Sequence, residues 1–181
     1  MTVTTVGAQV ALAIDLMQKY SSVYFALGQT DAWKNDDKPD AEDSKATEIP
    51  NVRNYIQVQD STLCRPLQPD EAAPENPIVF NKTTYVRVSQ KDAYSQNATC
   101  IYFSTKASLK DLTSEGTYSF RSTGVYIGLK PKDGVTKPVL SPSDVQDKGT
   151  LFSYGNGAQK VLDSETSIKL GAVYTLAPFE A

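Results

Sequence analysis

The stretch VYFALGQTDAWKNDDKPD, residues 23–40, joins an apolar run, an isolated tryptophan and a charged segment. The apolar run at 23–27 is rich in aromatic and β-branched residues, a composition typical of a strand. It ends at Gly28, which we expect to permit a turn. Trp33, the single tryptophan of the chain, is then expected to pin either the returning chain or a neighbouring subunit. Residues 36–40 begin an acidic loop that is expected to face outward.

The segment before this run has the spacing of an amphipathic helix. In VGAQVALAIDLMQKY, residues 6–20, apolar side chains recur every three or four positions and therefore share one helical face. Thr4 or Thr5 can cap the first turn, because a hydroxyl oxygen accepts a hydrogen bond from an unpaired N–H. The apolar stripe must be buried, either on the sheet that follows or on a neighbouring subunit.

Most of the remaining chain alternates between apolar and polar residues, as half-buried antiparallel strands do. Strands and helices do not alternate along the sequence, which argues against a doubly wound parallel sheet. The sequence therefore predicts an α+β, mainly β fold, with an N-terminal amphipathic helix followed by an antiparallel sheet, sandwich or barrel with long loops. We expect a single domain over residues 1–181. The expected strands are 23–27, 52–59, 84–89, 98–105, 117–122, 124–129 and 171–177.

Three long loop-like segments interrupt the strands, at residues 31–50, 65–77 and 130–149. The first holds seven acidic and three basic residues, a local charge of −4. All three contain proline, which removes a backbone donor and so excludes a central strand. Loops of this length are usually functional or are ordered by a partner.

The composition indicates a thin core. The apolar share is 40%, below the roughly 45–50% of typical globular domains. The ten tyrosines suit surfaces that are apolar on one side and polar on the other, and tyrosine is enriched at interfaces. These features favour a homo-oligomer that completes its burial against copies of itself or other partners.

Several kinds of chemistry are disfavoured by the residues present. The sequence contains no histidine, which removes the commonest general base and metal ligand. No nucleotide-binding loop appears, and a net charge of −3 disfavours nucleic acid as a partner. No apolar run is long enough for a membrane span, and no signal peptide is evident. We predict no catalytic residue, no metal and no cofactor.

Two side-chain groups leave alternatives open. The carboxylates that follow Trp33 are interpreted as a solvated acidic loop, with a site for a hard cation as the alternative. Lys38 and Pro39 break the spacing of a calcium loop. Cys64 and Cys100 are expected to be free thiols, although one disulfide between them is possible. The acidic group comprises Asp36, Asp37, Asp40, Glu42 and Asp43.

The stretch YFALGQTDAWKNDDKP resembles a pattern found in virion structural proteins of contractile-tailed bacteriophages, including the baseplate wedge family. In that pattern an aromatic strand ends in glycine, and a tryptophan, an acidic loop and a proline follow. The resemblance spans residues 6–55. It departs at Ala32, where the pattern favours proline, and it has one following proline where the pattern often has two. The matching residues are Tyr24, Phe25, Gly28, Thr30, Trp33, Asp36 and Pro39.

The resemblance implies a non-enzymatic structural subunit of a bacteriophage virion, in the tail, baseplate or neck (the head–tail connector region). Such a subunit is made in the host cytoplasm and contacts copies of itself and neighbouring virion proteins. One alternative is a carbohydrate- or receptor-binding β module of a phage tail, with Trp33 and exposed tyrosines as stacking platforms. Another is a carboxylate-based hydrolase. The residues expected at an interface are Tyr24, Trp33, Asp36, Asp37 and Asp40.

Overall fold

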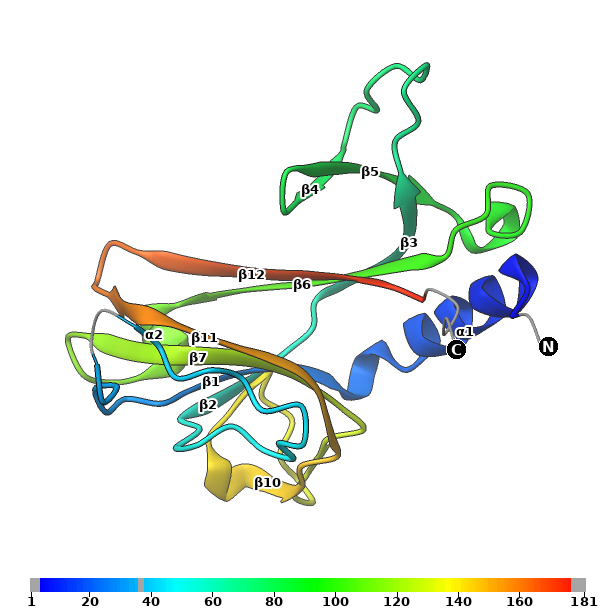
Figure 1. The fold of residues 1–181 in the computed structure, drawn as a ribbon. Coiled ribbons are helices and arrows are strands. Elements are labelled where there is room, and N and C mark those ends of the chain that lie inside the picture. The colour runs from blue at the N-terminus through cyan, green and yellow to red at the C-terminus, as the bar shows by residue number, and fades with distance from the viewer. Residues whose placement is uncertain (1–3, 36–37, 177–181) are drawn as a thin grey trace. The chain divides into compact units, whose positions relative to one another are not determined.

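The computed structural model describes residues 4–35 and 38–176, and their contacts divide the chain into two compact units. The helix unit holds the described residues up to 20, residues 59–104 and those from 171 onward. The second unit holds residues 21–58 and 105–170. We call it the strap unit, after the long connection at residues 29–53 that is described below. The expected α+β, mainly β fold with an N-terminal helix and antiparallel sheets is confirmed (Figure 1). A single domain over the whole chain stays a prediction.

The sheet of the strap unit has the order β11-β7-β1-β2-β9 and is antiparallel throughout. The expected strand at 23–27 is its central strand β1, and all six of its residues are buried. Because successive side chains of a strand point to opposite faces, β1 is buried on both faces of the sheet, which explains why this segment is apolar at successive positions rather than alternating. The strands are β1 Val23–Gly28, β2 Asn54–Gln57, β7 Tyr118–Ile127, β9 Val139–Leu140 and β11 Thr150–Leu162.

Tyrosines form much of the core on one face of this sheet. Tyr55 and Tyr126 meet edge to face, with ring centroids 5.4 Å apart, a favoured geometry for aromatic pairs. Burial raises the pKa of Tyr55 to about 12. Ile49 reaches this cluster from the connection between β1 and β2. Tyr24, Ala26, Leu129 and Leu140 complete the buried cluster.

The remaining elements of the strap unit are short. Helix α2, Leu109–Leu112, begins with a capping box between Ser108 and Asp111. The segment 130–149, expected to be a loop, contains β8 Lys130–Pro131, the 3-10 turn Pro142–Asp144 and β10 Val145–Asp147, besides β9. Strands β8 and β10 pair only with each other. As expected, this proline-containing segment forms no central strand. It does contain short strands of two or three residues.

The second sheet has the order β12-β6-β3-β5-β4. Helix α1, Val6–Gln18, packs on β3 within the helix unit. Val10 and Ala13 of the helix belong to a buried cluster that includes Leu63 of β3. Of the two expected alternatives, the apolar stripe is therefore buried on the sheet of its own chain. The strands are β3 Asp60–Pro66, β4 Ile78–Phe80, β5 Thr83–Val88, β6 Cys100–Ser108 and β12 Ser167–Thr175. Two 3-10 turns, Tyr20–Ser22 and Gln90–Asp92, follow α1 and β5.

The two cysteines lie far apart in the sequence and opposite each other in the structure. Cys64 on β3 pairs in register with Cys100 on β6. Both side chains are buried and both thiols are free. The hydroxyl of Thr175 lies 3.4 Å from the Cys100 sulfur. The pair therefore contributes small, mainly apolar side chains to the core of the helix unit.

The observed strands differ from the expected ones in three respects. Residues 117–122 and 124–129 form one continuous strand, β7, because Gly124 does not interrupt pairing. The strand expected at 52–59 is limited to β2, and a separate strand, β3, begins at Asp60 in the other sheet. Strands β3, β4 and β11 were not expected. In β11, two glycines flanking Asn156 hide the strand pattern.

The start of α1 offers a test of its capping. The Thr5 hydroxyl accepts a hydrogen bond from the Ala8 N–H at 3.2 Å. We expect Thr5→Ala to lower the free energy of unfolding by about 1 kcal/mol, because an orphan N–H loses its partner. Thr4→Ala is the matched control and should change little. Urea denaturation measures both, and equal effects of the two substitutions would contradict the assignment of Thr5 as the cap.

Candidate functional site

Strand β11 forms an edge of the strap-unit sheet, and the long connection between β1 and β2 lies against it. We call this connection, residues 29–53, the strap; residues 36 and 37 lie outside the described residues. An edge strand of 13 residues exposes a row of backbone donors and acceptors that can pair with another chain. Figure 1 shows the strap, in blue to cyan, running beside β11 and β7.

Side chains of the strap bind the backbone of β11. The indole N–H of Trp33 donates to the carbonyl of Gly157 at 2.8 Å. The carboxylate of Glu42 accepts the backbone N–H of Asn156 at 2.9 Å. Two adjacent backbone groups of the edge strand are thus occupied by side chains rather than by another strand.

Asn156 also holds the strap through its own side chain. Its Nδ2 donates to the carbonyl of Asp40 at 2.9 Å, while its Oδ1 accepts from the Ser122 hydroxyl at 2.7 Å. One residue of β11 therefore connects the strap to the neighbouring strand β7. Next to it, the Tyr154 hydroxyl accepts a hydrogen bond from the Asp43 N–H.

The two ends of the strap are tied together at its base. The Gln29 N–H donates to the Pro50 carbonyl at 3.0 Å, and the Asn51 side-chain amide donates to the Asp31 carboxylate at 3.1 Å. Just before Pro50, the Ile49 N–H donates to the buried hydroxyl of Tyr126 on β7 at 3.0 Å. The strap is therefore fixed at its base, over the face of the sheet and along the β11 edge.

The glycine that ends β1 has a different role from the one expected. Gln29, with φ of 52°, is the residue in the left-handed region, so the turn does not depend on Gly28 for that conformation. A Cβ on Gly28 would lie 2.9 Å from the Pro50 carbonyl oxygen and 3.2 Å from the Val52 Cα. Gly28 is needed because the returning end of the strap passes so close to β1.

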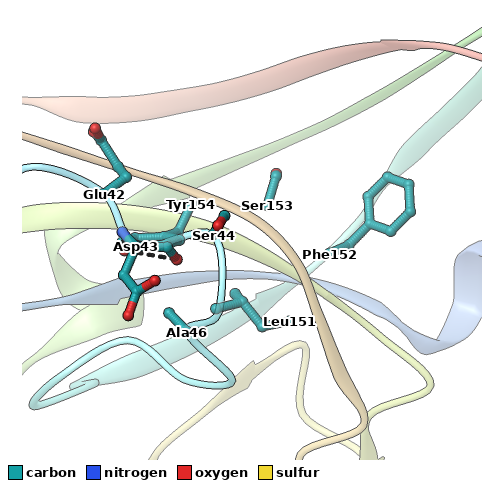
Figure 2. Close-up of a pocket in the computed structure, with 8 residues that line it drawn as sticks. All are labelled: Glu42, Asp43, Ser44, Ala46, Leu151, Phe152, Ser153 and Tyr154. Carbon is teal, nitrogen blue, oxygen red and sulfur yellow. Dashed lines mark hydrogen bonds between the residues drawn. The ribbon is translucent and has the colours of Figure 1, made fainter. Parts of the chain in front are cut away.

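A cavity of about 310 Å³ lies between the strap and the beginning of β11. Figure 2 shows the residues from both segments and the hydrogen bond between Asp43 and Tyr154 that joins them. Phe152, 42% exposed, lies at this cavity. The lining residues are Glu42, Asp43, Ser44, Ala46, Leu151, Phe152, Ser153 and Tyr154.

The charges of the strap are mostly not paired. Among the described carboxylates of the strap, only Glu48 forms an ion pair, with Lys148 at 2.6 Å. The Asn156 N–H beside Glu42 holds the pKa of that carboxyl below its ordinary value, so it is ionised at neutral pH. Asp40 and Asp43 are exposed. The five described carboxylates of the strap are accompanied by four basic residues, Lys34, Lys38, Lys45 and Arg53, so its described part carries a net charge of only −1, with several carboxylates exposed to solvent.

The structure separates the residues expected at an interface. Trp33 and Tyr24 are buried within the strap unit, at 8% and 3% exposure. Asp40 is exposed and its backbone carbonyl is held by Asn156, whereas Asp36 and Asp37 lie outside the described residues. A role for any of them at an interface stays a prediction.

Sequence reasoning missed the residues that receive the strap. Asn156 and Gly157 lie in the segment YGNG, which reads as a turn rather than as part of a strand. Tyr154 was expected only as one of many tyrosines suited to contacts. Phe152 and Tyr154, which flank Ser153, form a short alternation that could have indicated this strand.

Within residues 4–35 and 38–176, no group of three or more Cys, Asp or Glu side chains is arranged to hold a metal ion. No helix in this part of the chain is both long and apolar enough to cross a membrane.

Close packing of the strap on β7 can be tested at Gly124. A Cβ added there would lie 2.5 Å from Ile49 Cδ1 and 2.8 Å from the Ser153 carbonyl oxygen. We expect Gly124→Ala to lower the free energy of unfolding by about 1–3 kcal/mol, as overpacking does. Gly116→Ala is the control, because nothing lies within 4 Å of its added Cβ. Thermal and urea unfolding compare the two; a similar small effect of both would show that the strap does not press on β7.

Comparisons with known proteins agree with the resemblance seen in the sequence. A relative, "Virion protein 3" of Enterococcus phage phiEF24C, is 27% identical over 176 residues, which cover 97% of this chain and 96% of that protein. The sequence model of the family described as "Baseplate wedge 3 tail fiber network component" matches residues 1–176. The expected relationship to virion structural proteins of contractile-tailed bacteriophages is thereby confirmed, and the chain belongs to the baseplate wedge 3 tail fiber network component family.

Proposed function

We propose that this chain is a non-enzymatic structural subunit of the phage baseplate, where it binds neighbouring virion proteins through its strap. The family is one of baseplate and tail-fibre network components, which favours the baseplate over the neck. The proposal includes contacts with other copies of the chain, as the thin core and the tyrosine content indicate.

The observation that carries the proposal is the strap, which is held rigidly while its charges remain available. Trp33 donates a hydrogen bond to β11, and Asp40 and Glu42 each accept one from it, which fixes the strap on that strand. A loop that is ordered before binding loses less conformational entropy when a partner docks, which favours specific assembly. The exposed carboxylates add charge complementarity, which sets the choice of partner and the rate of encounter.

Trp33 and Tyr24 have supporting roles in this proposal. Their burial suits residues that position the strap, with Trp33 linking it to Gly157. The contact surface is instead formed by exposed residues such as Asp40, together with Phe152 and the cavity beside it. A stable contact requires roughly 1,000 Å² or more of buried surface, so we expect neighbouring segments to contribute as well.

Charge reversal on the strap tests the proposal. Asp40→Lys replaces an exposed side chain that makes no hydrogen bond or ion pair with the described residues, so the fold should be retained. We expect its incorporation into virions to fall at least about tenfold, because like charges placed together at an interface can weaken binding by more than 1.4 kcal/mol. Incorporation is measured by immunoblot of purified particles after complementation of a deletion phage.

Asp133→Lys is the matched control, an equal charge change at an exposed position of another loop of the strap unit. It should be incorporated normally, and thermal unfolding should show both variants folded. Normal incorporation of Asp40→Lys, or a wild-type chain absent from purified virions, would contradict the proposal.

A further inference from the structure

A polar cavity of about 460 Å³ lies in the helix unit, between the proline-rich loop after β3 and the turn that precedes β6. It is separate in sequence from the strap, and the proposed function does not use it. Its lining residues are Arg65, Pro66, Gln68, Ser95, Gln96 and Asn97.

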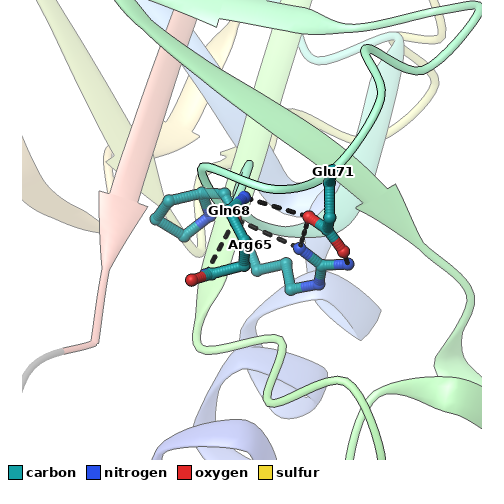
Figure 3. Close-up of polar contacts among 4 residues, drawn as sticks. Arg65, Gln68 and Glu71 are labelled. Atoms are coloured by element: carbon teal, nitrogen blue, oxygen red, sulfur yellow. Dashed lines mark hydrogen bonds and ion pairs between the residues drawn. The ribbon is translucent and has the colours of Figure 1, made fainter.

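The first wall of this cavity is held by an ion pair. Arg65 binds both carboxylate oxygens of Glu71, at 2.7 and 2.6 Å, as Figure 3 shows. The Gln68 N–H donates to the same carboxylate at 2.9 Å. The Arg65 guanidinium lowers the pKa of Glu71 to about 2, so the pair stays ionised and its two charges balance.

The second wall is a compact turn fixed by its own backbone. The Gln96 N–H donates to the Asp92 carbonyl at 3.0 Å, and the Ala98 N–H donates to the Ala93 carbonyl at 2.9 Å. Ala93 and Ala98 are fully buried in the core of the helix unit. Both walls therefore hold their shape without a ligand.

Polar groups on both walls remain available. The side-chain amides of Gln96 and Asn97 form no hydrogen bond with any described residue. Gln68 uses only its NH₂ group, in a long 3.5 Å contact with the Pro66 carbonyl, which leaves its amide oxygen free. Among the described residues, no carboxylate and no lysine lines the cavity, and Glu71 compensates the charge of Arg65.

We propose that this cavity is a binding site for a neutral saccharide. Each free amide presents a donor and an acceptor side by side, and a sugar hydroxyl both donates and accepts. Peptide anchors favour apolar pockets filled by aromatic or aliphatic side chains, and Pro66 is the single apolar residue in this lining. The volume lies within the about 300–1,000 Å³ of small-ligand sites.

The site can be tested on the full chain by NMR, with maltose, lactose and N,N′-diacetylchitobiose as probes. We expect at least one disaccharide to shift the side-chain amide resonances of Gln68, Gln96 and Asn97 in a saturable manner. Gln96→Ala should weaken that binding about fivefold to tenfold, the effect of removing one or two neutral hydrogen bonds. Its backbone spectrum should otherwise stay unchanged, because this amide has no role in the fold.

Gln146→Ala is the matched control, at an exposed glutamine in β10 of the other unit, and should bind as the wild type does. The proposal would be overturned if no disaccharide shifts these amides, if Gln96→Ala binds normally, or if the shifts map to residues outside the cavity. Because the isolated chain is used, a failure here is distinct from a failure of virion incorporation.

Discussion

The occupation of the β11 edge by side chains of the strap is the interaction that fixes the strap, and the proposed contact surface depends on it. Without it, an edge strand of 13 residues would offer its backbone to any extended chain, with the risk of unspecific pairing. Trp33 and Glu42 take up adjacent backbone groups of β11, and Asn156 secures the strap in return. The same contacts that block strand addition hold a charged loop in one position.

The strap also illustrates why some residues of the central strands are small. Gly28 of β1 and Gly124 of β7 lie where the strap passes close to these strands. A larger side chain at either position would displace the strap. Ile49 then reaches the tyrosine-rich core. A loop packed in this manner is part of the folded unit. Its surface is ordered before a neighbouring protein binds, which suits the proposed role in an assembly.

Much of the local structure could be predicted from the sequence, whereas β11, the strand that binds the strap, could not. The stripe at residues 6–20 indicates α1 because its period is regular, and VYFAL indicates β1 because it is continuously apolar. Strand β11 was not predicted because its sequence Gly155, Asn156, Gly157 is typical of a turn. Trp33 could be recognised as an anchor, but its partner lies 124 positions away, and no local pattern encodes such a distance.

Amide hydrogen exchange of the isolated chain, followed residue by residue with NMR, measures whether the strap is held in place. If the strap is held on the β11 edge as described, the N–H groups of Asp43, Ile49 and Asn156 are protected from exchange, since each donates to a group across the strap contact. The exposed N–H of Ala41, which has no partner among the described residues, should exchange rapidly in the same sample. Exchange of all four at unprotected rates would show that the strap is not fixed, and would contradict its proposed role as a preformed assembly surface.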